Sequence, residues 1–302
     1  MKRIILFVAV NLLVILVVSL LVNLLGIRPY LNARGVDYVA LLEFCALFGF
    51  AGSLISLSMS RWTAKMMMRV ELINPDHPQG AAESRIVEMV RNLVRKAELP
   101  ALPEIGVYES PEINAFATGP SKRRALLAIS SGLLNAMDDD AVEGVIGHEL
   151  SHVANGDMVT MTLLQGVVNT FVMFLSYVIA FAIDNAMRSR DSEERGGGLG
   201  YFSQMILIWV LESALMFLAS PIIYAYSRWR EYRADAGSAR LTARETMIHA
   251  LESLKRATQV EDNRAPALSS FKINGRGHGL MALLFSTHPP IDARIEALRN
   301  LH

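Results

Sequence analysis

The sequence predicts an α+β protein, mainly α, that is integral to a membrane. Three observations predict this class. About four apolar segments are long enough to cross a bilayer as helices. About a hundred residues between the second and third segments combine an amphipathic helical pattern with short strand patterns. Directly after these strand patterns, His148-Glu149-Leu150-Ser151-His152 places two histidines and a glutamate at helical spacing.

The composition agrees with a membrane protein. The 302 residues are 52% hydrophobic, with a mean hydropathy of +0.32, and 29 basic residues balance 29 acidic ones. Because the formal net charge is zero, no overall field attracts a polyanion, and we expect no nucleic-acid partner. The single cysteine, Cys45, lies in an apolar segment. It allows no internal disulfide, which agrees with a reducing compartment for the soluble part.

The apolar segments are expected to form two transmembrane hairpins. They cover roughly Ile4–Leu25, Tyr38–Met59, Val159–Ile183 and Phe202–Tyr226. The first could be a secretory signal, but it is long for one and no A-x-A-like cleavage site follows before Pro29, which favours an uncleaved anchor. The third is diluted by polar residues. Residues outside the pair can share one metal ion only if the third and fourth segments both cross or neither does, so we expect them to act as one hairpin.

The apolar segments also divide the chain into domains and set its orientation. We expect a hairpin at 1–60, the first part of a catalytic domain at 61–158, a second hairpin at 159–227 and the second catalytic part at 228–302. Eight basic residues near segment ends lie on the catalytic side and five on the opposite side. Since basic residues are enriched in cytoplasmic loops, the catalytic domain is expected to face the cytoplasm.

The soluble region before the histidine motif is expected to hold one helix and three strands. Residues Ala82–Glu98 carry an apolar stripe at helical spacing. Strand patterns follow at Glu104–Glu109, Asn114–Thr118 and Ala125–Ser130, and we expect them to form a small antiparallel meander. The segment Asn114-Ala115-Phe116-Ala117 is the candidate edge, which could pair with an extended peptide. An ordinary sheet strand is an equally good interpretation.

The histidine motif predicts a metal site. On a helix both imidazoles reach one metal ion, and Glu149 lies beside them to handle the protons of a metal-bound water. The acidic run Asp138–Asp140 supplies N-cap oxygens, and Asn155-Gly156-Asp157 ends the helix. A chance match in a core helix is the alternative, and the caps on both sides favour the metal site.

A third ligand must come from elsewhere, because catalytic zinc usually has three protein ligands. The continuation to a third histidine fails, since Asn155 and Met158 occupy the positions where Gly and His are needed. Glu231 and Asp235 share a helical face beyond the fourth segment, so one could ligate while the other orients a histidine. A charged interfacial helix is an equally good interpretation of this pair. The other candidates are His77, His249, His278, His288 and His302.

His148-Glu149-x-x-His152 followed by Glu231-x-x-Ala234-Asp235 resembles the pattern of a family of membrane zinc proteases that includes the bacterial HtpX proteases and the CAAX prenyl proteases. The resemblance covers nearly the whole chain, including Asn114 to Ala117 and Thr287-His288-Pro289-Pro290. It implies a gluzincin-type arrangement with one Zn²⁺ per chain, held by His148, His152 and Glu231. It also implies a supporting role for Asp235.

The predicted activity is that of a zinc metalloendopeptidase with Glu149 as the general base. The resemblance further implies membrane quality control during stress in the bacterial inner membrane, in cooperation with other membrane proteases. The substrates would be cytoplasmic regions of damaged or misfolded membrane proteins. Self-cleavage is expected as well, because the site would face the chain's own loops. The resemblance also implies that His288 helps to stabilise the oxyanion. A histidine in an ordinary turn is the alternative interpretation.

Two other functions are compatible with the sequence. A CAAX-type prenyl-peptide protease shares the zinc chemistry, but such relatives typically build an enclosed chamber from more membrane segments. A prenylated peptide compared with an unfolded membrane-protein fragment as substrate would discriminate between them. A non-proteolytic zinc-dependent scaffold is the other candidate, and Glu149 argues against it because a structural metal site needs no general base.

Overall fold

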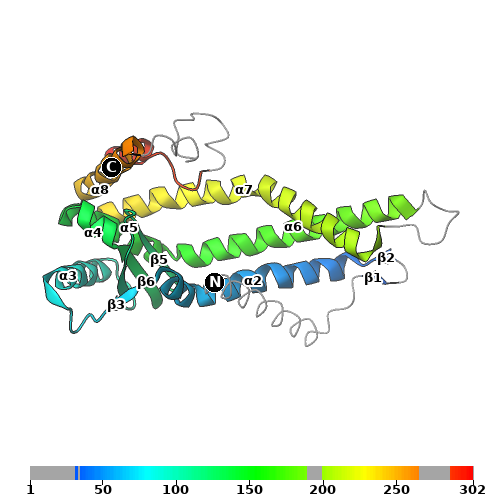
Figure 1. Ribbon diagram of the computed structural model, residues 1–302, viewed down its shortest axis with the longest axis horizontal. Coiled ribbons are helices and arrows are strands. Elements are labelled where there is room, and N and C mark those ends of the chain that lie inside the picture. Colours follow the sequence, from blue (N-terminus) through cyan, green and yellow to red (C-terminus); the bar gives the residue numbers. More distant parts are fainter. Residues whose placement is uncertain (1–30, 33–34, 189–198, 265–285, 302) are drawn as a thin grey trace. The chain divides into compact units, whose positions relative to one another are not determined.

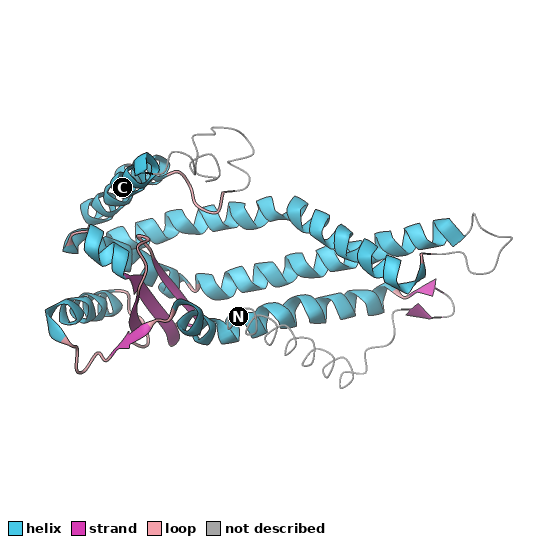
Figure 2. Ribbon diagram, in the orientation of Figure 1, coloured by secondary structure: helices cyan, strands magenta, loops and turns pink. Residues whose placement is uncertain are grey.

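The structure, a computed structural model, describes residues 31–32, 35–188, 199–264 and 286–301 (Figure 1). The first predicted apolar segment, Ile4–Leu25, lies outside these residues, as do His278 and His302. The described chain is mainly helical with a small sheet, which confirms the α+β class (Figure 2). It divides into two compact units, residues 1–56 with 162–223 and residues 57–161 with 224–302.

Three helices in the described part of the chain are long and apolar enough to cross a membrane. They are α2 (Tyr38–Met68), α6 (Asp157–Arg188) and α7 (Gly200–Leu241), and they contain the second, third and fourth predicted apolar segments. Each extends beyond its segment, because polar residues continue the helix past the apolar run. A short hairpin of β1 (Leu31–Asn32) and β2 (Gly35–Val36) precedes α2.

Within the first unit, α2 and α6 approach closely through glycines. A Cβ added to Gly49 would lie 2.5 Å from Thr170 Oγ1, and one added to Gly166 would lie 2.8 Å from the ring of Phe50. Apolar attraction between helices is weak where the solvent is lipid, so small residues that allow close packing hold such pairs together.

The second unit contains a four-stranded sheet of β3 (Glu71–Ile73), β4 (Glu104–Tyr108), β5 (Ala115–Ser121) and β6 (Arg124–Ser130). The strand order is β3-β4-β6-β5, with β4 and β6 parallel and the other pairs antiparallel. The three predicted strands therefore exist, but the predicted antiparallel meander is wrong: the sheet is mixed. In β6 every residue from Ala125 to Ser130 is buried, so this strand takes a central place and separates β4 from β5.

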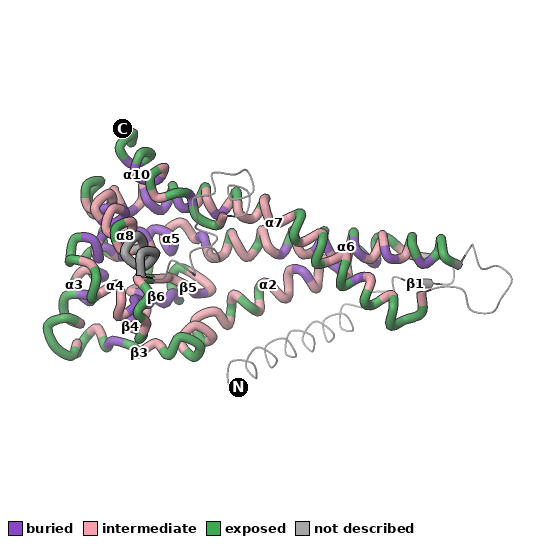
Figure 3. Tube along the Cα trace, turned by 45° about the horizontal axis from the view of Figure 1, so that its top comes forward, coloured by how far each residue is buried: buried purple, intermediate pink, exposed green. Residues whose placement is uncertain are grey.

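Helices cover this sheet and complete the core. The amphipathic helix is α3 (Gly80–Lys96), which buries Ile86, Val87, Val90 and Leu93 in one cluster with β3, β4, β6, α4 (Ser131–Ala136) and α5 (Asp139–Asn155). A second cluster joins α8 (Arg244–Arg264) to α10 (Ile291–Arg299). Buried positions are most continuous along β6 and α5, which places α5 in the centre of the unit (Figure 3).

The central strand gives a test of this packing. Leu127 is fully buried, so Leu127→Ala should lower the free energy of unfolding by about 2–5 kcal/mol. Leu72 on the edge strand β3 is 51% exposed, and Leu72→Ala should change it by less than about 0.5 kcal/mol. Denaturant unfolding in detergent micelles measures both variants. Equal effects would contradict the central position of β6.

Candidate metal centre

The helix that carries the histidine motif begins and ends where the sequence predicts. The Asp138 carboxylate accepts a hydrogen bond from the Ala141 N–H at 2.9 Å at the start of α5. Gly156 ends the helix with φ 72°, a left-handed conformation that glycine adopts without steric cost. The chain therefore turns sharply one residue after α5, and α6 starts at once with Asp157.

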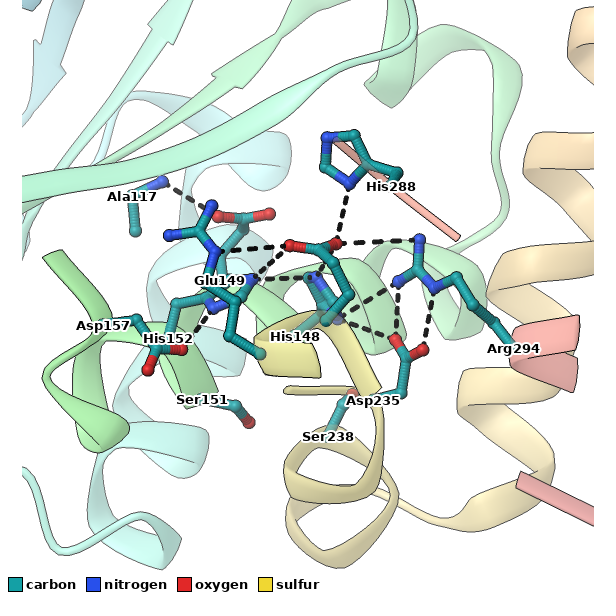
Figure 4. Close-up of polar contacts among 12 residues, drawn as sticks. Ala117, His148, Glu149, Ser151, His152, Asp157, Asp235, Ser238, His288 and Arg294 are labelled. Atoms are coloured by element: carbon teal, nitrogen blue, oxygen red, sulfur yellow. Dashed lines mark hydrogen bonds and ion pairs between the residues drawn. The ribbon is translucent and has the colours of Figure 1, made fainter. Parts of the chain in front are cut away.

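His148 and His152 of α5 lie side by side (Figure 4). Glu231 of α7 lies with them in one group of possible metal ligands. One ligand atom each from His148, His152 and Glu231 lie within 4.8 Å of one another. The two Nε2 atoms are 3.2 Å apart, and the Glu231 oxygens lie 3.5 Å from His148 Nε2 and 3.4 Å from His152 Nε2. All three side chains are buried. The structure thus brings together the three predicted ligands.

Buried carboxylates orient both imidazoles. Asp235 Oδ1 lies 2.9 Å from His148 Nδ1, and Asp157 Oδ2 lies 2.7 Å from His152 Nδ1. When each Nδ1–H donates to its carboxylate, both Nε2 lone pairs face the Glu231 carboxylate. Acceptors that converge in this way are satisfied by a cation. Two imidazole nitrogens and one carboxylate oxygen are the protein ligands of many catalytic zinc ions, so these residues fit a metal.

The electrostatics of the site favour positive charge. Burial lowers the pKa of the His148 imidazole, but hydrogen bonds with Asp235 and Glu231 outweigh burial and raise this pKa to about 9. Burial also lowers the pKa of His152, and hydrogen bonds with Asp157 and Glu231 again produce a net rise. Carboxylates that attract a proton this strongly also attract a metal cation.

Small residues let α7 approach α5. A Cβ added to Gly147 would lie 2.7 Å from Ser238 Oγ, and one added to Gly237 would lie 2.6 Å from Ser151 Oγ. The Ser238 hydroxyl donates to the Gly144 carbonyl oxygen at 2.8 Å. This close contact places Glu231 and Asp235, four residues apart on one face of α7, against the two histidines, as the sequence predicts.

Arg294 of α10 holds Asp235 in place. Its Nε and Nη2 donate to the two Asp235 oxygens at 2.8 and 2.6 Å, and its Nη1 lies 3.9 Å from Glu231 Oε2. Sequence analysis missed this residue. A signal was available, because Arg294 lies beside Ile291, Ile295 and Leu298 on the apolar face of a short helix, where a charge requires a partner.

The orienting role of Asp157 was also missed. Sequence analysis placed this residue only in the stop signal after α5. Its position at the start of α6 brings its carboxylate back to His152, and it is 1% exposed. An acidic residue directly after a helix-ending glycine was the available signal.

Glu149 lies where the motif helix meets the sheet. Its Oε2 accepts a hydrogen bond from the Ala117 N–H at 2.9 Å. Ala117 belongs to β5, which is a terminal strand of the four-stranded sheet, so the predicted edge segment contacts the predicted general base.

Of the remaining candidate histidines that the structure describes, one lies at the site and two lie away from it. His288 lies at the site, with Nδ1 2.8 Å from Glu231 Oε2 and a side chain that is 60% exposed. His249 instead contacts the Asp138 carboxylate at the start of α5, at 2.8 and 3.0 Å. His77 lies in the turn between β3 and α3, where its backbone N–H donates to the Asn74 carbonyl oxygen.

The fold and the ligand geometry together are those of a membrane metalloprotease, and comparison with known proteins identifies the family. Residues 81–302 match the model of Peptidase family M48. The Protease HtpX homolog of Methylacidiphilum infernorum is 48% identical over 304 residues, which cover 99% of both chains. Protease HtpX of Chromohalobacter salexigens is 46% identical and covers 99% of this chain and 98% of the relative. The chain therefore belongs to peptidase family M48 and is a metalloprotease of the HtpX type.

A solved structure shares the fold. Ste24p of S. mikatae matches with a TM-score of 0.61 at 17% sequence identity, covering 85% of this chain and 58% of that chain. At this identity the likeness concerns the fold alone.

The contact between α5 and α7 can be tested at Gly147. In Gly147→Val the new side chain would meet Ser238, which its hydrogen bond to Gly144 holds in place, and the two helices should separate. We expect a loss of about 1–3 kcal/mol in stability and clearly weaker metal binding. Ala81→Val, at an exposed position of α3, is the control. Wild-type metal affinity in Gly147→Val, measured by chelator competition, would contradict this account.

Proposed function

We propose that this metalloprotease is a zinc endopeptidase of the bacterial inner membrane. Its substrates would be cytoplasmic regions of damaged or misfolded membrane proteins. The observation that carries the proposal is the convergence of His148, His152 and Glu231 on one point, with Glu149 beside them. One Zn²⁺ per chain would be held by these three side chains.

The chemistry follows from what these residues can do. A zinc ion bound there would supply a water of lowered pKa and polarise the scissile carbonyl. Glu149 accepts the proton of the attacking water and delivers it to the leaving amine. Since the Ala117 N–H holds Glu149 Oε2, Glu149 Oε1 is the oxygen left to take the proton. No covalent nucleophile is needed, which agrees with the burial of Cys45 in α2.

The edge of the sheet supports an extended peptide as substrate. In an antiparallel pair, the N–H groups of alternate residues point to opposite sides of the strand. The Ala117 N–H points to Glu149 and not to β6, so the same side of β5 is the outer edge of the sheet. A peptide that adds to this edge would present its backbone next to Glu149. Such pairing uses hydrogen bonds to main-chain groups and does not depend on the side chains of the peptide. It therefore suits an enzyme with many unfolded substrates.

The membrane helices and the basic residues support the proposed location. Helices α2, α6 and α7 favour a membrane-bound enzyme, and the excess of basic residues on the catalytic side favours the cytoplasm. Cooperation with other membrane proteases belongs to the same proposal. Self-cleavage in detergent would follow if chains released from the bilayer present unfolded segments to the site.

Glu149→Gln tests the chemistry. The amide cannot take the proton, so turnover should fall by about 10²–10⁴-fold while the metal content is unchanged. The readouts are self-cleavage and cleavage of an unfolded membrane-protein fragment, with a prenylated peptide as the competing substrate. Glu143→Gln, on the same helix, is the matched control. Retained activity in Glu149→Gln would remove Glu149 from this role, and preference for the prenylated peptide would contradict the proposed substrates.

Glu231→Ala tests the ligand set. With two ligands left, zinc content and activity should be lost together. Elemental analysis of the purified protein measures the metal, and Glu245→Ala, at an exposed position of α8, is the control. Full zinc occupancy in Glu231→Ala would show that another residue ligates. His288 would then be the first to examine, because its Nδ1 already lies 2.8 Å from the Glu231 carboxylate.

A further inference from the structure

Arg230, next to Glu231 on α7, has a buried hydrogen-bond donor without an acceptor. Its side chain is 22% exposed, yet its Nε is shut off from solvent and has no hydrogen-bond partner among the described residues. Glu231 Oε1 lies 3.8 Å from this Nε. A buried donor without an acceptor destabilises the folded protein, so this position calls for an explanation.

The geometry of the helix alone does not bring Arg230 Nε close to the Glu231 carboxylate. Consecutive residues of a helix point in different directions, and their side chains do not ordinarily face each other. The Arg230 side chain must therefore fold back along α7 for its Nε to come near the Glu231 carboxylate. An exposed arginine would instead extend into water, where all its donors are satisfied.

The two oxygens of Glu231 have different surroundings. Oε2 has His288 Nδ1 at 2.8 Å, His148 Nε2 at 3.5 Å and Arg294 Nη1 at 3.9 Å. Oε1 has His152 Nε2 at 3.4 Å and Arg230 Nε at 3.8 Å. Carboxylates that bind a metal are themselves hydrogen-bonded, which fixes their orientation and raises metal affinity. Arg230 is placed to do this for Oε1.

Arg294, the other arginine at the site, is not placed to donate a hydrogen bond to Glu231 Oε1. Arg294 uses Nε and Nη2 for both oxygens of Asp235 and so acts on His148 through that carboxylate. Arginine suits a position beside a ligand, because its guanidinium stays charged and is hydrated more weakly than an ammonium group.

We propose that Arg230 is a positioning residue of the metal centre. Its Nε–H donates to Glu231 Oε1, and this bond presents the other carboxylate oxygen to the metal. Closing the 3.8 Å separation to the 2.7–3.2 Å of an N–H···O hydrogen bond needs only a small side-chain rotation. This role rests on the proposed function, since it requires Glu231 to be a ligand.

Metal affinity tests the role directly. In Arg230→Gln the dissociation constant for Zn²⁺, measured by competition with a chromophoric chelator, should rise by about 10–100-fold. The absorption spectrum of the Co²⁺-loaded protein should change as well, because it reports the ligand geometry. The kcat should fall while KM for the peptide stays the same. Arg233→Gln is the matched control, three residues along the same helix at an exposed position.

Arg230→Lys separates the hydrogen bond from the charge, and it guards against a folding defect because it keeps the positive charge and an apolar stem. It lacks the Nε–H, so it should bind Zn²⁺ as weakly as Arg230→Gln. Wild-type affinity in either variant would overturn the proposal. Equal losses in Arg230→Gln and Arg233→Gln would also overturn it. A wild-type protein that binds no metal would overturn the proposed function itself.

Discussion

The metal centre depends on two imidazoles whose Nδ1 atoms are fixed by buried carboxylates. A free imidazole has two tautomers and can rotate, so two histidines on one helical turn do not by themselves direct both Nε2 atoms to one point. Asp235 and Asp157, each 1% exposed, remove that freedom. A buried carboxylate is costly without a cation or hydrogen-bond donors. For Asp235, Arg294 supplies both, so α10 near the end of the chain contributes to the orientation of His148 on α5.

The left-handed break at Gly156 serves the same purpose over a much shorter distance. Without it, α5 would continue and the next acidic residue would move away along the helix axis. The left-handed conformation of Gly156 changes the course of the chain, and the Asp157 carboxylate lies 2.7 Å from Nδ1 of His152, five residues earlier. A single glycine conformation therefore ends the motif helix, precedes the start of α6 and places the carboxylate that orients His152. Other residues at position 156 would have to adopt a positive φ, at a cost of about 1–2 kcal/mol.

Features that depend on local periodicity could be predicted from the sequence. The α5 caps, the α3 stripe, the three described apolar helices and three of the four strands of the sheet follow from patterns within a few residues. The strand order could not be predicted, because it depends on which strand is buried on both faces. The residue patterns of β4 and β6 are both compatible with that central position. The three-residue strand β3 carries too little pattern to detect.

Long-range pairings were harder to predict from the sequence. The contact of His148 and His152 with Glu231 was suggested by residue type but rested on a family resemblance for its assignment. The contacts of Arg294 with Asp235 and of Arg230 with Glu231 were missed, because the sequence of one helix does not show which other helix will pack against it.

Charge balance explains why these residues form one set. Around the two histidines lie four carboxylates and two guanidinium groups, which leave two negative charges in a largely buried volume. The carboxylates are those of Glu149, Asp157, Glu231 and Asp235, and the guanidinium groups are those of Arg230 and Arg294. Uncompensated charge of this size is unstable away from water. Within this set, hydrogen bonds with Asp235 and Glu231 raise the pKa of His148. One divalent cation neutralises the excess while both imidazoles remain neutral, and neutral imidazole is the form that binds a metal. The same count explains the need for two arginines: with only one, a divalent cation would leave one negative charge uncompensated in this volume.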